Sequence, residues 1–443
     1  MDAREVALLT LSACQRQGAW SDGHLKKAIR EAGLDSRDGA LATTLCFGVL
    51  QNQMLLDFYL DCFSKVKTGK MEEKVRLALR MGVYQMLFLD RIPVSAAVNT
   101  AVDLVRKYSK NPRSAGLANG VLRTIARQES LPEPVGDPVQ RLAVRYSHPE
   151  WLTQAFLERL GPEETEALLM EDNGRPPIYA QVNPIKTDVE GLTDRLEREG
   201  VAAQSHTWLE GCLTLSGTGD LEQLPSFREG LFTIQDPAAR LTVLAAGPRP
   251  GMRVLDVCAA PGGKSFACAV AMGNEGEIVS CDIHTHKRTL IEKGALRLGL
   301  SCVSARTLDA RSFEPEYENA FDLVLADVPC SGLGVIRKKP DIRYKDPKPL
   351  AGLPAVQKAI LANVSSYVKP GGVLMYSTCT VLERENEAVI QDFLGKHSDF
   401  EPEAFRLPGP VGEVSEGMCT LWPHRHGTDG FFLCKLRRKG GGL

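Results

Sequence analysis

Two cysteines, Cys330 and Cys379, stand where neighbouring strands of a parallel sheet are expected to end. Cys330 lies in the segment Asp-Val-Pro-Cys-Ser-Gly at 327–332, and Cys379 lies in Tyr-Ser-Thr-Cys-Thr at 376–380. A thiolate can attack an electrophilic carbon and leave it in a later step. Ordinary burial is the competing interpretation, because free cysteine is among the most buried residue types. The pair therefore suggests covalent chemistry.

A zinc site is the second competing interpretation of these cysteines. The chain has 12 cysteines and no Cys-x-x-Cys pair, whereas structural zinc sites commonly contain one. Cys419, His424 and His426 fall in a region expected to form a hairpin loop. We therefore predict no metal. Cysteines this dispersed also do not form a disulfide framework, which favours a reducing, cytoplasmic location.

A glycine-bearing turn at 256–265 is suited to a nucleotide-like cofactor. Its end, Gly263-Lys264-Ser265, imitates a phosphate-binding loop, but such a loop needs glycine at position 258, where this chain has cysteine. Gly262 and Gly263 allow a cofactor to approach the backbone at the start of a helix. Asp282 follows Gly262 by roughly 20 residues, the spacing at which an acid meets ribose hydroxyls. NAD would also fit this pattern.

The second half of the chain alternates strands with helices. Apolar runs predict strands at 253–258, 277–283, 302–308, 321–327 and 372–377. Such alternation is typical of an α/β doubly wound, Rossmann-like sheet, which binds ligands beyond the carboxyl ends of its strands. Segments 417–422 and 430–436 predict a final antiparallel hairpin. Four acids fall at or just past the predicted strand ends: Asp256, Asp282, Asp309 and Asp327.

The first 130 residues predict an all-α bundle. Apolar side chains recur at helical spacing, as in Val94, Val98, Val102 and Val105. Segment 131–138 contains three prolines and a glycine, which end helices and stiffen the chain. We therefore expect three domains: a helical domain at 1–135, a linker with a small α/β module that positions substrate at 136–240, and the catalytic domain at 241–443.

Charge distribution gives a weaker indication of a partner. The net charge of −2 hides a basic first third and an acidic remainder. A basic helical face permits a polyanion partner, although solvated helices give similar counts. No apolar run approaches the roughly 20 residues of a membrane span, so we expect no membrane partner.

Four motifs resemble those of the RNA cytosine-5 methyltransferases that use S-adenosylmethionine. They lie at 256–265, 327–344, 376–380 and 429–432, in the family's order. Segment 118–123, with the helices before it, resembles the RNA-binding fold of NusB. Together these features resemble the Sun/RsmB type. That resemblance implies a monomer that modifies small-subunit (16S) ribosomal RNA at a site of the cytosine-967 type, with transfer RNA as the alternative substrate.

The resemblance also implies roles for individual residues. Cys379 would add to C6 of the cytosine, Cys330 would assist release of the adduct, Asp327 would contact the base near N3, and Lys264 would reach the active site. The implied S-adenosylmethionine contacts are Cys258, Ala259, Ala260, Pro261, Gly262, Gly263, Lys264, Asp282 at the ribose, Asp309 near the adenine, and Asp327. The predicted RNA contacts are Arg337, Lys338, Lys339 and Arg343, with Arg123 and Arg127 on the helical domain.

Two other classes of function stay open from the sequence. One is a non-catalytic RNA-binding or antitermination factor whose methyltransferase domain is a relic. The other is an ATP- or NAD-binding enzyme, which Cys258 and the paired thiols disfavour.

Overall fold

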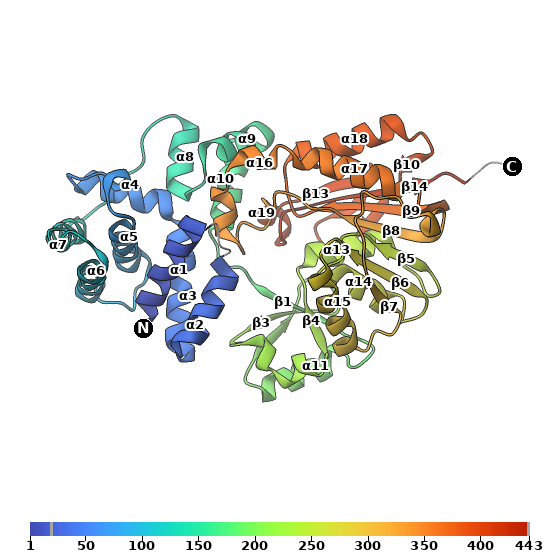
Figure 1. The fold of residues 1–443 in the computed structure, drawn as a ribbon, viewed down its shortest axis with the longest axis horizontal. Coiled ribbons are helices and arrows are strands. Elements are labelled where there is room, and N and C mark those ends of the chain that lie inside the picture. The colour runs from blue at the N-terminus through green and yellow to red at the C-terminus, as the bar shows by residue number, and fades with distance from the viewer. Residues whose placement is uncertain (18–20, 441–443) are drawn as a thin grey trace. The chain divides into compact units, whose positions relative to one another are not determined.

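The computed structural model describes residues 1–17 and 21–440 (Figure 1). The chain divides into two compact units. Unit 1 comprises Met1–Arg175 and Ile336–Lys345, and unit 2 comprises Pro176–Val335 and Asp346–Leu443. A short segment of the second half of the chain therefore belongs to the first unit. Among the described residues, no helix is both long enough and apolar enough to cross a membrane.

Unit 1 is helical, as predicted. Its amphipathic helices bury their apolar stripes in one core, to which α5 contributes Val75, Leu79 and Val83 and α6 contributes Val98 and Val102. The helices are α1 (Ala3–Gln17), α2 (Ser21–Ala32), α3 (Ser36–Gln51), α4 (Gln53–Phe63), η1 (Thr68–Lys70), α5 (Glu73–Phe88), α6 (Val94–Tyr108), α7 (Ser114–Ala126), α8 (Pro138–Tyr146), α9 (Glu150–Leu160), α10 (Pro162–Asp172) and η4 (Pro340–Tyr344).

The proline-rich segment 131–138 is not an edge of unit 1. Asp137 caps α8, with Pro138 in its first turn, so the prolines start a new helix of the same unit. Ser147 then ties this helix back to α4, because its Oγ accepts hydrogen bonds from the amides of Met54 and Leu55 at 3.1 and 3.2 Å. The unit therefore continues to Arg175.

Unit 2 begins with a small antiparallel sheet of order β2-β3-β1-β4. Its strands are β1 (Ile178–Val182), β2 (Ala202–Ser205), β3 (Cys212–Ser216) and β4 (Phe232–Ile234), accompanied by α11 (Val189–Arg198), η2 (Leu221–Gln223) and α12 (Pro225–Arg228). Leu192 and Leu196 of α11 pack on this sheet. Asn183 Nδ2 donates to the carbonyl of Leu298 at 2.9 Å, which joins the module to a helix (Thr285–Leu298) that packs on the large sheet of the same unit.

The large sheet has the order β10-β14-β9-β8-β5-β6-β7, with β13 added beside β14. Strands β5 (Arg253–Asp256), β6 (Glu277–Asp282), β7 (Val303–Thr307), β8 (Phe321–Asp327) and β9 (Val368–Thr378) run parallel. Strand β14 (Phe431–Arg438) is antiparallel to β9 and pairs with β13 (Met418–Leu421), while β10 (Phe400–Pro402) closes the edge. The predicted doubly wound sheet and C-terminal hairpin are confirmed.

Helices cover both faces of this sheet (Figure 1). Leu323 packs into the core shared with α13 (Pro237–Ala246), α14 (Gly263–Ala271) and α15 (Thr285–Leu298), whereas its neighbour Val324 packs into the core shared with α17 (Leu353–Ser365) and α18 (Glu387–Lys396). Burial on both faces explains why these strands read as continuous apolar runs. The remaining short elements are η3 (Pro315–Tyr317), α16 (Pro347–Leu350), η5 (Glu383–Glu385), β11 (Phe405–Leu407), β12 (Gly412–Val414) and α19 (Pro423–His426).

Candidate active site

The two thiols meet at the carboxyl edge of the large sheet. Strands β8 and β9 are parallel neighbours in which Asp327 pairs with Ser377, so the residues that follow them emerge side by side. Cys330 follows β8 and Cys379 follows β9, and their Sγ atoms lie 3.1 Å apart. Both are free and half-buried. The structure thus brings together the two cysteines that the sequence placed at neighbouring strand ends.

A half-buried ion pair lies at the same edge. Lys264, in the first turn of α14, places Nζ 2.6 Å from Asp327 Oδ2. Ser377 donates to the other oxygen of Asp327 at 2.8 Å. Burial disfavours the charged ammonium, yet the Asp327 carboxylate and the nearby Asp256 and Cys379 raise the pKa of Lys264 above its ordinary value. A fixed positive charge therefore stands beside the thiols.

Asp256 lies at the end of β5, beneath this pair. It is buried, and its Oδ2 accepts a 2.8 Å hydrogen bond from Ser265, which itself accepts one from Ser280. Burial raises the pKa of Asp256 to about 7. Among the described residues, no side-chain hydrogen-bond partner of its Oδ1 is found. Asp256 thus fixes the start of α14, the helix that carries Lys264.

The predicted cofactor turn is compact and closed by backbone bonds. The Gly262 amide donates to the Ala259 carbonyl at 2.6 Å, and the Ala259 amide donates to the Cys281 carbonyl at 2.8 Å. Gly262 has a φ of +114°, and a side chain there would place Cβ 2.3 Å from the Phe266 ring. Both its backbone conformation and its packing therefore require glycine.

The other two predicted cofactor acids occupy the adjoining strand ends. Asp282 ends β6, and its carboxylate accepts from the His284 amide at 2.9 Å. Asp309 follows β7, and two nitrogens of Arg311 bind its carboxylate at 3.0 and 2.7 Å. Hydrogen bonds from Arg311 hold the pKa of Asp309 below its usual value. An adenine contact at Asp309 would share the carboxylate with Arg311.

Two of the four predicted RNA contacts after Cys330, Arg337 and Arg343, are buried in the structure. Arg343 is fully buried in unit 1, where its guanidinium donates to Asn173 Oδ1 at 2.7 Å and to the Ser147 carbonyl at 3.2 Å. Arg337 is 5% exposed and pairs with Glu171, also in unit 1. Carbonyls at the ends of α8 and α10 attract Arg343, since helix C-termini carry partial negative charge. Burial of this kind is incompatible with a phosphate contact for Arg343.

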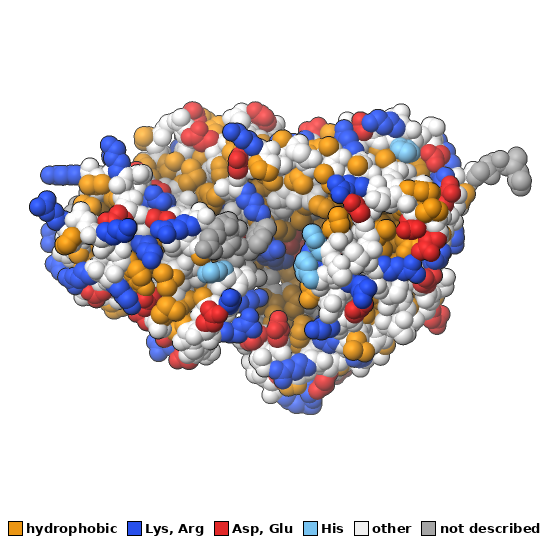
Figure 2. All heavy atoms as spheres, in the orientation of Figure 1, with side chains coloured by type: hydrophobic (Ala, Val, Ile, Leu, Met, Phe, Trp, Pro, Cys, Tyr) orange, Lys and Arg blue, Asp and Glu red, His pale blue; other side chains and the backbone are white. Residues whose placement is uncertain are grey.

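Lys338 and Lys339 are less buried than these two arginines: the first is half-buried and the second exposed. On α7, Arg123 and Arg127 are exposed, as expected from the amphipathic pattern. Figure 2 shows Lys and Arg side chains over the part of unit 1 that carries α6 and α7. RNA contacts therefore remain predicted for Lys338, Lys339, Arg123 and Arg127.

Replacing Arg343 should destabilise unit 1. In Arg343→Met, the carbonyls of Asp172, Tyr146 and Ser147 lose a buried charged donor, and we expect a loss of about 3 kcal/mol in unfolding free energy. Denaturant titration of the full chain would measure it. Arg123→Met on the exposed face of α7 is the matched control and should change stability by less than about 0.5 kcal/mol. Equal stability of the two variants would contradict the structural role of Arg343.

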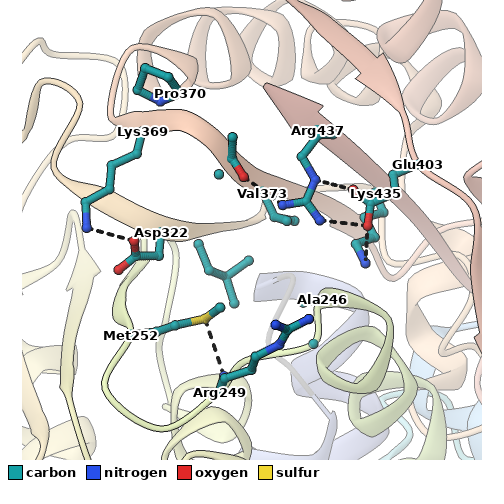
Figure 3. A pocket seen from close by; sticks show the side chains of 14 residues that line it. Ala246, Arg249, Met252, Asp322, Lys369, Pro370, Val373, Glu403, Lys435 and Arg437 are labelled. Carbon is teal, nitrogen blue, oxygen red and sulfur yellow. Dashed lines mark hydrogen bonds and ion pairs between the residues drawn. The ribbon is translucent and has the colours of Figure 1, made fainter. Parts of the chain in front are cut away.

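A separate pocket of about 240 Å³ lies at the opposite edge of the sheet (Figure 3). It is lined by the start of β8 and by the turn at 369–372 in β9, whose other end leads to Cys379. Lys369 pairs with Asp322 at 2.7 Å, and Lys435 pairs with Glu403 at 2.8 Å, so these cations are already neutralised. None of the predicted catalytic residues lines this pocket. No group of three metal-ligating side chains occurs among the described residues.

Several residues at the thiol edge were missed by sequence analysis. Ser377 orients Asp327, Phe431 lies under Lys264 with Nζ 4.8 Å from its ring centroid, and the buried Glu385 and Gln357 contact the turn around Cys330. Phe431 was visible as part of the motif at 429–432. Glu385 lies in a charged run, Glu-Arg-Glu-Asn-Glu, that is typical of an exposed turn.

Three family models match the chain. One described as 16S rRNA methyltransferase RsmB/F matches residues 242–437, one for the NusB family matches 1–127, and one for the ferredoxin-like domain of RsmF/B-like methyltransferases matches 148–222. Together with the Rossmann-like sheet, these matches define an RNA methyltransferase. The predicted NusB-like front and methyltransferase domain are confirmed.

Whole-chain relatives agree with the family models. A protein named probable ribosomal RNA small subunit methyltransferase B from Bacillus subtilis is 40% identical over 99% of both chains. A relative of the same name from Synechocystis is 35% identical over 99% of this chain and all of its own. The solved structure of a protein called PH0851 is 28% identical, with a TM-score of 0.80 over 98% of this chain and 97% of its own. The chain belongs to the RsmB/F family of ribosomal RNA methyltransferases.

Proposed function

We propose that this RNA methyltransferase modifies C5 of a cytosine through a covalent bond between Cys379 Sγ and C6 of the base. One observation carries the proposal: two free thiols 3.1 Å apart, beside the Lys264–Asp327 ion pair, at the cofactor-binding edge of the sheet. Methyl transfer to an oxygen or to an exocyclic nitrogen needs no thiol. Methyl transfer to C5 of cytosine does need such a group, because C5 becomes nucleophilic only after a nucleophile has added to C6.

The proposed reaction uses the two thiols in sequence. The Cys379 thiolate forms a bond to C6, and the electron pair of the C5–C6 double bond becomes available at C5. After C5 has gained its methyl group, Cys330 takes the proton from C5. The electrons of that C–H bond restore the double bond, and the C6–S bond breaks to release Cys379 as a thiolate.

Local charges favour this order of events. Interactions with Asp327 and Cys379 raise the pKa of Lys264, so its ammonium charge is kept near Cys379. The hydrogen bond with Cys379 and burial raise the pKa of Cys330, which keeps it protonated at the start. Once Cys379 has become a thioether, it no longer carries the charge that holds this proton. Cys330 can then give its proton to water, which carries away the one proton that the overall reaction releases, and serve as the base for the C5 proton.

Asp327 is proposed to bind the base at N3. Its two carboxylate oxygens are held by Lys264 and Ser377 at 2.6 and 2.8 Å. Negative charge develops on the pyrimidine ring during thiolate addition, and a proton shared between Lys264 and Asp327 can be offered to it. The carboxylate therefore needs its fixed orientation.

S-adenosylmethionine is the proposed cofactor, and when bound it supplies an electrophilic methyl group. The residues present fit it chemically. Turn 258–264 offers closely approachable backbone at a helix start, Asp282 follows the strand end where ribose hydroxyls would bind, and Asp256 places a buried carboxyl group near the turn. NAD and ATP are disfavoured, because neither requires a thiol pair.

Gly262→Ala tests the cofactor turn. The added methyl group meets both the unfavourable φ and the Phe266 ring, so we expect affinity for S-adenosylmethionine, measured by calorimetric titration, to fall by at least tenfold. Gly273→Ala is the matched control, because Gly273 also has a positive φ but a Cβ there meets nothing within 4 Å. Unchanged affinity in Gly262→Ala would contradict a cofactor site at this turn.

We propose small-subunit ribosomal RNA as the substrate, at a cytosine of the 967 type, modified in the cytoplasm by a monomer. The whole-chain relatives are named as small-subunit ribosomal RNA methyltransferases, which supports this substrate over transfer RNA. The test is methylation of purified 16S ribosomal RNA and transfer RNA in parallel, followed by mass spectrometry of the nucleosides. We expect 5-methylcytidine from ribosomal RNA. A methyl group on another base or atom would contradict the reaction, and a product from transfer RNA alone would contradict the substrate.

A further inference from the structure

Glu385 is a buried carboxylate next to the Cys330 turn. It ends η5 and is 0% exposed. Its Oε2 accepts a 2.9 Å hydrogen bond from the Ser331 amide and a 3.0 Å bond from Gln357 Nε2, while no partner of its Oε1 is found among the residues that the structure describes. No ion pair of Glu385 with a Lys or Arg side chain is found in the part of the chain that the structure describes. A charge buried in this way is costly, which suggests a functional reason for it.

Glu385 and Gln357 hold the Cys330 turn from both sides. Gln357, from α17, also donates to the carbonyl of Pro329 at 3.0 Å, so the residues before and after Cys330 are both fixed. Tyr376 of β9 donates to the backbone carbonyl of Glu385 at 2.6 Å. The carboxylate is therefore anchored to the strand that leads to Cys379.

Opposite charges consequently flank the thiol pair. Lys264 interacts with Cys379, whereas Glu385 interacts with Cys330 and disfavours its thiolate. Cys379 and burial are the larger reasons for the raised pKa of Cys330, and Glu385 adds to them. Tyr376, whose pKa burial raises, is another titratable group near Cys330. It stays neutral, so Glu385 supplies the fixed negative charge on this side.

We propose that Glu385 is a positioning residue that fixes the division of labour between the thiols. It holds the Cys330 turn through the Ser331 amide and places a carboxyl group beside Cys330, so that the two thiols lie in different electrostatic surroundings. This proposal rests on the proposed function, because that reaction defines the separate roles of the two thiols. The difference in thiol acidity itself can be measured without RNA.

Glu385→Gln removes the charge and keeps an oxygen acceptor for the Ser331 amide. The experiment measures alkylation of Cys330 and Cys379 by iodoacetamide across pH 6–10 in the full chain, with each site quantified by peptide mass spectrometry. In the unmodified protein we expect Cys379 to react first. In Glu385→Gln we expect Cys330 to react about tenfold faster at neutral pH, which corresponds to one pKa unit, with its profile moved to lower pH. Glu383→Gln, at an exposed carboxylate of the same turn, is the matched control.

A second variant covers the case in which Glu385→Gln fails to fold. Gln357→Lys places an ammonium beside the retained carboxylate and neutralises its charge, so Cys330 should again react faster. Unchanged Cys330 reactivity in every variant that folds would overturn the proposal. If the reactivities change as expected while no protein forms an RNA adduct, the proposed function fails and the role of Glu385 in thiol acidity stands.

Discussion

Cys379→Ser is expected to abolish methyl transfer, with a loss on the order of 10⁴-fold or more in single-turnover rate. A serine hydroxyl ionises far less readily than a thiol, so the C6 addition that activates C5 cannot occur near neutral pH. Covalent capture of RNA carrying 5-fluorocytosine should disappear together with turnover. The rate is measured as transfer of labelled methyl groups to RNA, and capture as a shift in denaturing gel electrophoresis.

Cys419→Ser is the matched control for this variant. Cys419 is also half-buried but lies in β13, away from the thiol pair, and its replacement should leave rate and capture within a few-fold of the starting values. If Cys379→Ser still captured RNA covalently, the nucleophile would be Cys330 instead.

Cys330→Ala is expected to behave in the opposite way and to accumulate a protein–RNA adduct that resists denaturant. The Cys379 thiolate remains, so addition and methyl transfer proceed, but the base that removes the C5 proton is absent. The first turnover should take place and later turnovers should nearly stop, with multiple-turnover rate falling on the order of 100-fold or more.

The control for Cys330→Ala is Cys302→Ala, at a half-buried thiol in the segment before β7. It should turn over normally and form no stable adduct. Normal turnover without adduct in Cys330→Ala would contradict a role in release.

Much of the fold was predictable because its signals are local. Strands such as β8 are buried on both faces and therefore form continuous apolar runs, and the helices of unit 1 carry regular apolar stripes. The extent of unit 1 was not predictable in this way. Segment 131–138 leads into α8, with Pro138 in the first turn of that helix, and long-range contacts such as those of Ser147 with α4 place α8 in the same unit.

The candidate site was partly predictable for a related reason. Asp327, Cys330 and Cys379 were found because parallel strands bring their carboxyl ends to one edge. Arg343 was misinterpreted, because a basic residue in a loop gives no local sign that the carbonyls of Ser147 and Asp172 enclose it. Glu385 was missed because its neighbours in sequence are polar, while its burial depends on distant contacts with α17 and the Cys330 turn.

The most direct test of the central claim is to identify the amino acid that becomes attached to RNA. The unmodified protein is incubated with S-adenosylmethionine and 5-fluorocytosine-substituted small-subunit ribosomal RNA, the adduct is digested with nuclease and protease, and the modified peptide is sequenced by mass spectrometry. We expect a methylated fluoropyrimidine nucleotide bound to Cys379. Attachment at Cys330, or the absence of any adduct under conditions in which unsubstituted RNA is methylated, would contradict it.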